Sequence, residues 1–386
     1  MMRILLAVLL TLPVLQGCSW FKSWGDEEPG DPAPLVDFEE SVKVRKEWST
    51  GVGDGMGKAG ISMPPLYIGG TLYVADHKGH LAAVNAENGK KNWEIKTKLP
   101  FSAGPAVGES LLVMGTLDGS VLAFDPASGN ERWSARVSSE VLAVPGISDS
   151  IVVVRSIDGR VFGLDADSGA RVWIHDHSVP LLTLRGNTNI LLRGGTVFVG
   201  YEDGSVTALR LDDGSQIWTQ SIVSLEGRTE LERLADIGIQ MVLVASDLIV
   251  SSYKDRVVSI AADSGRLLWF KEISSATGVQ VDRTNLAVSD ASGDLWLLDR
   301  RNGSTVWKID QLTNRGLTLP AFYGDLVVVG DKEGYLHWIN TQDGSFVARV
   351  REGKKGFAGG PLTVGTTLYV LDRKGTLAAY RAGAAL

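Results

Sequence analysis

Two histidines are the first candidates for chemistry, as metal ligands. His175 and His177 are separated by one residue, so on a β-strand their side chains would point to the same side, as two ligands of a zinc ion do. Asp176 would point to the other side, and no third ligand stands at a suitable spacing in the sequence. Polar residues on an exposed outer strand explain the pair more simply. The sequence therefore predicts no metal site.

Sequence patterns that carry catalysis are also missing. The chain has no Gly-x-Ser-x-Gly nucleophile motif, no phosphate-binding loop and no paired-carboxylate motif. Its 45 acidic residues outnumber 38 basic ones, which argues against the clustered basic surface that nucleic-acid binding requires. We predict a protein that is not an enzyme, holds no cofactor and binds no nucleic acid.

The only cysteine, Cys18, is placed for lipid attachment. An apolar run from Ile4 to Leu15 follows a short basic start and has the length of a signal-peptide core, too short to span a bilayer. The run ends in Leu15-Gln16-Gly17-Cys18, which resembles a bacterial lipobox. We predict a signal peptide over 1–17 and an acylated Cys18 as the first mature residue, whose several acyl chains make attachment permanent.

The segment that follows Cys18 predicts a flexible tether. Residues 18–40 contain an acidic, proline-rich run at 26–34 that cannot bury enough apolar surface to order itself. Ser19 stands where an Asp tends to accompany inner-membrane retention in such lipoproteins. We therefore expect an anchor in the outer membrane, with the folded body at 41–386 on the periplasmic side.

A Gly followed four residues later by a Trp recurs about every 40 residues through the rest of the chain. Trp48 precedes the first pair, and Ala348 takes the Trp position in the last copy, so the sequence contains eight units. We interpret the Trp side chains as packing between units, because buried aromatic residues dominate such interfaces. The complete pairs end at Trp93, Trp133, Trp173, Trp218, Trp269 and Trp307.

Each unit also has an apolar run followed by a tight turn. Because Gly tolerates the positive φ of a hairpin turn, these turns are β-hairpin signals. Units of about 40 residues with roughly four strands are typical of β-propeller blades. The turns centre on Gly79, Gly119, Gly159, Gly204, Asp255, Gly293, Gly334 and Gly375.

The two ends of the chain predict how the ring closes. Phe357 to Tyr380 supply the inner strands of a last blade, and Val42 to Trp48 form an unaccompanied outer strand. Pairing the two leaves no exposed seam. The predicted fold is thus all-β, an eight-bladed β-propeller of four-stranded blades, closed by pairing the N-terminal outer strand with the C-terminal inner strands.

The signature Asp-x-x-x-Gly-x-x-x-Trp, complete at Asp125 to Trp133, resembles the repeat of the quinoprotein (PQQ dehydrogenase-like) propellers. A dehydrogenase of that superfamily would carry adjacent cysteines, calcium ligands and a catalytic Asp, whereas Cys18 is the only cysteine here. The segments expected to line the channel, 102–105 and 357–361, offer small residues without convergent carboxylates.

Three stretches exceed the usual spacing: Trp48 to Gly79, which is Gly-rich at 51–60, and the two neighbouring connections that join blade 3 to blade 4 and blade 4 to blade 5. In a four-stranded meander these two connections both emerge on one face of the ring. The first contains Leu182, Leu184 and Arg185, and the second runs through 225–236. Apolar side chains mixed with Arg and acids indicate a protein-binding patch. The alternative is that Leu182 and Leu184 only cover blade edges.

Lipobox, tether, blades and loops together resemble the BamB family of outer-membrane assembly lipoproteins over essentially the whole mature chain. The resemblance implies a non-enzymatic periplasmic scaffold that binds the POTRA domains of BamA and meets other assembly lipoproteins indirectly. It also implies that Leu182, Leu184 and Arg185 form one contact loop and Asp236 the second, with Gly238 where a further Asp is common. The alternative function is a lipid-anchored quinoprotein oxidoreductase or ligand-binding propeller.

Overall fold

The computed structural model describes residues 30–57, 61, 63–108, 110–180, 188–223, 237–238, 240–253, 256–275 and 277–385. Its contacts divide the chain into two units, Met1–Asp31 and Pro32–Leu386. Nearly all described residues belong to the second unit. No helix in the described ranges has the length and apolar character needed to cross a membrane.

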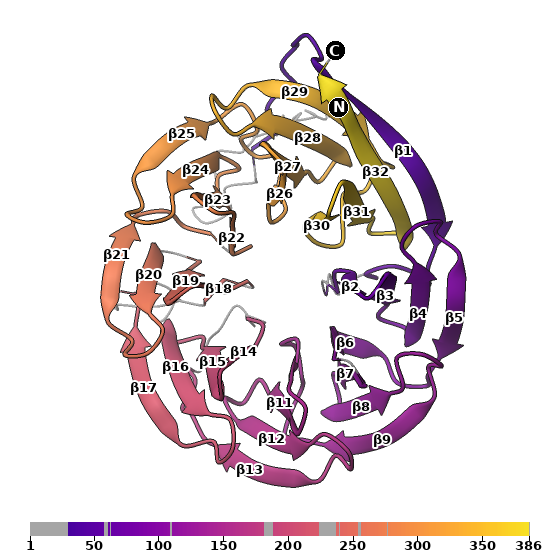
Figure 1. Ribbon diagram of the computed structural model, residues 1–386, viewed down its shortest axis with the longest axis vertical. Helices are drawn as coiled ribbons and strands as arrows, with labels where there is room; N and C mark the ends of the chain where they lie inside the picture. Colours follow the sequence, from indigo (N-terminus) through magenta and orange to yellow (C-terminus); the bar gives the residue numbers. More distant parts are fainter. Residues whose placement is uncertain are drawn as a thin grey trace, which may run out of the picture. The chain divides into compact units, whose positions relative to one another are not determined.

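The second unit is a closed ring of eight four-stranded antiparallel sheets, which confirms the predicted fold (Figure 1). The strands of each blade are given from the inner to the outer one. Blade 1 consists of β2 (Leu66–Ile68), β3 (Thr71–Ala75), β4 (His80–Asn85) and β5 (Lys91–Lys96), and blade 2 of β6 (Phe101–Val107), β7 (Leu112–Thr116), β8 (Ser120–Phe124) and β9 (Glu131–Arg136). Blade 3 consists of β10 (Gly146–Ile147), β11 (Ile151–Arg155), β12 (Val161–Asp165) and β13 (Arg171–His175), and blade 4 of β14 (Leu191–Arg193), β15 (Thr196–Gly200), β16 (Ser205–Arg210) and β17 (Gln216–Ser221).

The other four blades follow the same order. Blade 5 consists of β18 (Val242–Val244), β19 (Asp247–Ser251), β20 (Val257–Ala261) and β21 (Leu267–Lys271), and blade 6 of β22 (Val279–Val281), β23 (Asn285–Ser289), β24 (Leu295–Asp299) and β25 (Thr305–Ile309). Blade 7 consists of β26 (Ala321–Tyr323), β27 (Leu326–Gly330), β28 (Tyr335–Asn340) and β29 (Phe346–Arg351), and blade 8 of β30 (Leu362–Val364), β31 (Thr367–Leu371), β32 (Thr376–Ala385) and β1 (Val42–Gly51).

Burial along the strands explains why these residues form blades. The second and third strands are packed between neighbouring blades on both faces, so they read as continuous apolar runs; β11, for example, is buried throughout. The outer strands alternate instead, because only one face packs; in β9 Trp133 is buried between exposed neighbours.

The tryptophans of the repeat join each blade to the next one in the ring. In seven cases the indole Nε1 donates to a backbone carbonyl in the turn between the third and fourth strands of the following blade, over 2.8 to 3.2 Å. The Gly of that turn lets the indole approach: a Cβ on Gly129 would lie 2.8 Å from the Trp93 ring. The interpretation of these residues as packing between blades is confirmed.

Ala348 stands where the seventh blade would have its Trp, and the ring explains the exception. The eighth blade has no turn between its third and fourth strands, because the two strands come from opposite ends of the chain. No such turn exists there to accept the indole bond. Instead, the Tyr323 hydroxyl donates to the Thr366 carbonyl over 2.6 Å, and its ring packs edge-on against Trp338.

Closure of the ring joins β1 to β32 in a long antiparallel ladder. Lys46 on β1 also forms an ion pair with Glu352, 2.5 Å apart, just after β29. The Tyr380 hydroxyl on β32 donates to the same carboxylate, and burial raises the pKa of that hydroxyl. The predicted pairing of the two ends is therefore confirmed, and it includes a contact with blade 7.

Candidate protein-binding face

One face of the ring carries both the connections between blades and the hairpins that join the second and third strands of each blade. We call it the connection face. Backbone bonds tie the two together: Thr97 N donates to Gly79 O over 2.8 Å in blade 1, and Ile222 N to Gly204 O over 3.0 Å in blade 4. The two long connections thus emerge on the same face, as the meander predicted.

The predicted contact residues themselves lie outside the described residues. Leu182, Leu184 and Arg185 fall in 181–187, and Asp236 falls in 224–236. The lipidation site, Cys18, falls in 1–29. These residue assignments stay predictions, and the described geometry is that of the segments that follow the two connections.

The C-terminal ends of the two connections are joined directly. The buried Thr188 hydroxyl donates to the carbonyl of Ile237 over 3.1 Å. Asn189 Oδ1 then accepts a bond from Met241 N over 3.3 Å. Asp236 precedes Ile237, and Arg185 lies three residues before Thr188. The sequence segments predicted to bind a partner therefore lead into one hydrogen-bonded pair of stems.

A cluster of charged and aromatic side chains from blades 3 and 4 lies beside the start of the long connection that joins these two blades. Arg155, at the end of β11, forms an ion pair with Glu202 in the hairpin of blade 4, and the two side chains are only 3% and 1% exposed. The imidazole of His177 stacks on the Tyr201 ring at 3.7 Å, and the Arg155 guanidinium lies 5.1 Å from the same ring. A buried charge pair of this kind requires close geometry, because both charges have lost water.

His177 also binds Asp203 in the same hairpin. Its Nε2 lies 2.9 Å from Asp203 Oδ2. Burial alone would raise the pKa of Asp203, but hydrogen bonds from His177 and Ser205 hold that pKa below its ordinary value. The segment leading into the first connection is thus fixed to blade 4 by a stacked ring and a charged hydrogen bond.

The sequence did not single out Arg155 or Glu202. A charged residue that ends an otherwise apolar buried strand is the signal that could have identified Arg155. The two histidines considered as ligands do not converge on a metal site: His177 is engaged with Asp203, and Asp176 accepts a bond from Arg160 over 2.8 Å. In the described residues, neither histidine belongs to a group of three candidate ligands.

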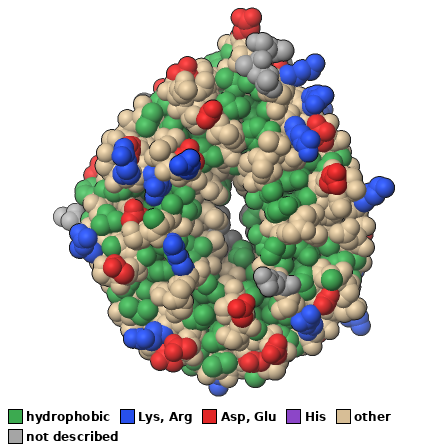
Figure 2. All heavy atoms as spheres, in the orientation of Figure 1, with side chains coloured by type: hydrophobic (Ala, Val, Ile, Leu, Met, Phe, Trp, Pro, Cys, Tyr) green, Lys and Arg blue, Asp and Glu red, His purple; other side chains and the backbone are tan. Residues whose placement is uncertain are grey.

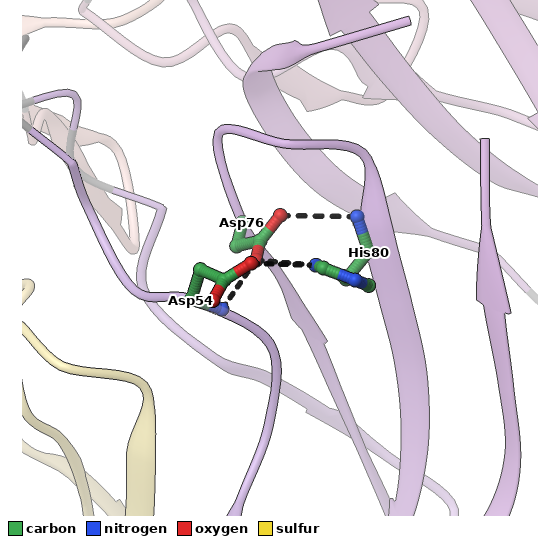
Figure 3. A group of neighbouring side chains, drawn as sticks. All are labelled: Asp54, Asp76 and His80. Atoms are coloured by element: carbon green, nitrogen blue, oxygen red, sulfur yellow. Dashed lines mark hydrogen bonds and ion pairs between the residues drawn. The ribbon is translucent and has the colours of Figure 1, made fainter. Parts of the chain in front are cut away.

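One group of three candidate ligands does occur among the described residues, Asp54, Asp76 and His80 (Figure 3). Its central carboxylate is already saturated. Asp76 accepts bonds from the backbone N of Asp54, Lys78 and His80, and from His80 Nδ1 at 2.7 Å. These bonds keep the pKa of Asp76 low, although burial alone would raise it.

The same turn recurs elsewhere in the ring, which explains this group without a metal. The Asp at the first position of the hairpin accepts the backbone N of the residues two and four positions later in blades 6, 7 and 8. These carboxylates belong to Asp290, Asp331 and Asp372. Asp76 therefore stabilises the hairpin turn by accepting hydrogen bonds from its backbone.

The central cavity tests the alternative of a quinone-binding propeller. It has a volume of about 460 Å³ and is lined mainly by small and apolar residues, including Gly104, Pro105 and Phe357. These come from the segments expected to line the channel. Asp331 is the one carboxylate in the described lining, and it is bound by Arg315 and His337. Apart from Asp331, the described lining supplies side-chain amides and hydroxyls but no carboxylate, so it does not fit a quinone with a divalent cation, whose charge calls for acidic ligands.

The face of the ring drawn in Figure 2 carries charges of both signs. On the face drawn in Figure 2, hydrophobic side chains surround the central opening, whereas basic and acidic side chains are interspersed, mostly nearer the rim. This mixed pattern is unlike the basic stripe of a nucleic-acid-binding protein.

Comparisons with known proteins identify similar sequences. Residues 77–309 match the family described as "Outer membrane protein assembly factor BamB". The protein of that name from Xanthomonas campestris pv. campestris is 41% identical, over 98% of this chain and 97% of the relative. The one from Pseudomonas aeruginosa is 48% identical, over 90% of this chain and 92% of the relative.

Comparison with solved structures identifies proteins of similar fold. The crystal structure of BamB from Moraxella catarrhalis superposes with a TM-score of 0.80 at 26% identity, covering 88% of this chain and 100% of that one. A quinohemoprotein alcohol dehydrogenase from Comamonas testosteroni has a TM-score of 0.70 at 12% identity, covering 88% of this chain and 76% of that one. At that identity the likeness is one of fold alone.

Proposed function

The chain belongs to the BamB family of outer membrane protein assembly factors, and from this premise we propose that it is a scaffold of the outer-membrane β-barrel assembly machinery. In this role it binds the POTRA region of BamA through its connection face. The proposal includes a lipid anchor at Cys18 that holds the ring at the periplasmic face of the outer membrane. The predicted absence of enzymatic activity agrees with the relatives, which are named as assembly factors.

The joined stems of the two long connections are the observation that carries this proposal. Thr188 and Ile237 are buried and hydrogen-bonded, so the segments that follow Arg185 and Asp236 are held together on a rigid ring. Loops fixed by a rigid scaffold are a frequent place for protein binding. Arg185 suits such a contact, because its guanidinium makes directed hydrogen bonds while its stem packs on apolar surface.

Co-purification from cells tests the partner. Arg185→Ala, and Leu182→Ala combined with Leu184→Ala, should each abolish recovery of BamA with the tagged protein after mild detergent extraction. Arg301→Ala is the matched control, because this exposed Arg lies in a turn on the opposite face of the ring. Recovery of BamA with the loop variants at the wild-type level would show that another surface makes the contact.

The anchor is tested separately. Cys18→Ser should abolish palmitate labelling and flotation with outer membranes, because the thiol is the attachment atom. Unchanged labelling and flotation in this variant would contradict the anchor and would leave the partner proposal standing.

The alternative of a quinoprotein oxidoreductase has no observation in its favour beyond the fold. Asp331 in the central cavity is occupied by Arg315 and His337, and the rest of the described lining offers mainly small and apolar groups. We therefore retain the scaffold as the single proposed function.

A further inference from the structure

Before β1 the chain makes a series of contacts with blade 7, although it has no regular secondary structure there. We call residues 33–41 the N-terminal strap. At its start, Ala33 N donates to Thr313 O over 2.9 Å, and Arg315 Nη1 donates to Ala33 O over 2.7 Å. At its end, Ser41 N donates to Val347 O over 3.0 Å. The strap is therefore bonded at both ends.

The middle of the strap is held by an aromatic pair and an arginine. The Phe38 ring stacks on Phe346 of β29, with centroids 5.7 Å apart. The Arg349 guanidinium lies 4.8 Å from the Phe38 ring, and its Nη1 donates to Val36 O over 3.0 Å. Backbone and side chain of the strap are thus both recognised by β29.

The two arginines that hold the strap belong to one buried network. Arg315 is 2% exposed and donates from Nε to Asp331 over 2.7 Å. Asp331 also binds His337 Nε2 at 3.0 Å, and Arg349 Nε donates to His337 Nδ1 over 3.2 Å. These bonds hold both guanidiniums through groups other than the strap, so blade 7 and the connection before it present two oriented arginines to an extended segment.

Comparison with other blades shows what the strap covers. Val347, Val172 and Val306 occupy the same position of their outer strands, one residue before the Trp position. Val347 is 6% exposed, whereas Val172 and Val306 are 52% and 48% exposed. The outer strand of blade 7 is therefore shielded where the others face solvent.

The strap runs from one face of the ring to the other, and this determines the face from which the tether leaves the ring. Its start lies at Thr313 and Arg315, in the connection before blade 7 on the connection face. Its end lies near the beginning of β29, on the opposite face of the ring, where β1 starts. When the strap is docked, the first residue bonded to the ring is Ala33, on the connection face. Without docking it would be Val42, on the opposite face.

We propose that the N-terminal strap is a clamp that makes the lipid tether leave the ring on the connection face, the face of the proposed BamA contact. This inference rests on the proposed lipid anchor at Cys18. With the strap docked, the free tether runs from residue 18 to 33, which spans at most about 50 Å when extended. With the strap released, it would run to residue 42 on the far face and span about 80 Å. The tether therefore starts from the face of the proposed partner site only while the strap is docked.

Docking of the strap is tested in a lipid-free chain that carries Cys18→Ser. Pro34→Cys combined with Lys332→Cys places one thiol at the start of the strap and one on the connection face of blade 7; both positions are exposed. A short bismaleimide should cross-link this pair efficiently. The pair of Pro34→Cys with Gln342→Cys, on the opposite face, should cross-link poorly.

Release of the strap needs a substitution that leaves the blade intact. Phe38→Ala removes the ring that stacks on Phe346 and lies beside Arg349, and it should lower the docking equilibrium about tenfold. Cross-linking of 34 with 332 should fall accordingly, while Glu39→Ala, at an exposed strap position, should leave it unchanged. Equal cross-linking of both thiol pairs in the unsubstituted strap would overturn docking.

Orientation on the membrane is tested with the lipidated protein on liposomes that contain a headgroup acceptor dye. Energy transfer should be stronger from a donor at Lys332→Cys than from one at Gln342→Cys, and Phe38→Ala should reduce the difference. If the protein floats with the liposomes but both donors transfer equally, only the clamp is wrong. If it fails to float, the proposed anchor is wrong and the clamp falls with it.

Discussion

The buried ion pair between Arg155 and Glu202 provides the sharpest test of how blades 3 and 4 support the first long connection. Arg155→Met leaves Glu202 buried and unpaired, and Glu202→Met does the same to Arg155. Removing one partner of a pair buried this deeply costs about 3–5 kcal/mol of the free energy of unfolding. That is a large share of the roughly 5–15 kcal/mol that stabilises a folded protein.

The double variant should behave differently. Arg155 Nε and Glu202 Oε2 have no hydrogen-bond partner in the described part of the chain, so the native pair recovers only part of its desolvation cost. Replacing both residues by Met should therefore leave the free energy of unfolding within about 1 kcal/mol of wild type, or raise it. The two single losses are thus not additive.

Urea unfolding of the four proteins, followed by circular dichroism, measures this double-mutant cycle. The exposed pair of Arg160 and Asp176 is the control, and its cycle should show no resolvable coupling, because solvent screens both charges. Small losses in both single variants at Arg155 and Glu202, or a double variant as unstable as their sum, would refute the reasoning.

Three other expectations concern the ring itself. Trp133→Phe should lower the free energy of unfolding by about 1–2 kcal/mol, because it leaves the buried Ala166 carbonyl without the 2.8 Å indole bond; an unchanged urea midpoint would contradict this. Deleting 375–386 removes an inner strand of the closing blade and should prevent stable folding, whereas deleting 20–31, before the strap, should leave the melting temperature unchanged. Burial lowers the pKa of His337 below its ordinary 6.5, so the unfolded chain binds more protons than the folded ring as pH falls below about 6.5. The free energy of unfolding should therefore decrease on acidification through that range, and His337→Gln should flatten the decrease; identical pH profiles would exclude His337 as the cause.

The blades were predictable because their markers are local. A Gly that needs positive φ, such as Gly79 at 84°, and a Trp at fixed spacing each recur in seven of the eight copies, and both depend on the strand and turn that contain them. The exception at Ala348 was visible in the sequence, but its reason was not. It depends on the eighth blade being assembled from both ends of the chain, which removes the turn that would accept an indole.

The contacts that sequence reasoning missed join residues far apart along the chain. The Arg155 and Glu202 pair crosses two blades, and Arg315 reaches Ala33 near the other end of the chain. The acidic, proline-rich composition before β1 indicates a tether, yet Phe38 and Val36 within it find specific partners on blade 7. Composition predicts how a segment behaves by itself, and it does not reveal the side chains on a distant part of the chain that bind it.

The most direct test of the proposed scaffold is the affinity between the purified protein and the isolated POTRA region of BamA, measured by calorimetry. Wild type and the Arg301→Ala control should bind equally, whereas Arg185→Ala should bind about thirtyfold more weakly, since loss of an interface anchor of this kind costs about 2 kcal/mol. Equal affinity for all three proteins, or no binding by wild type, would contradict the assignment of the connection face as the partner site.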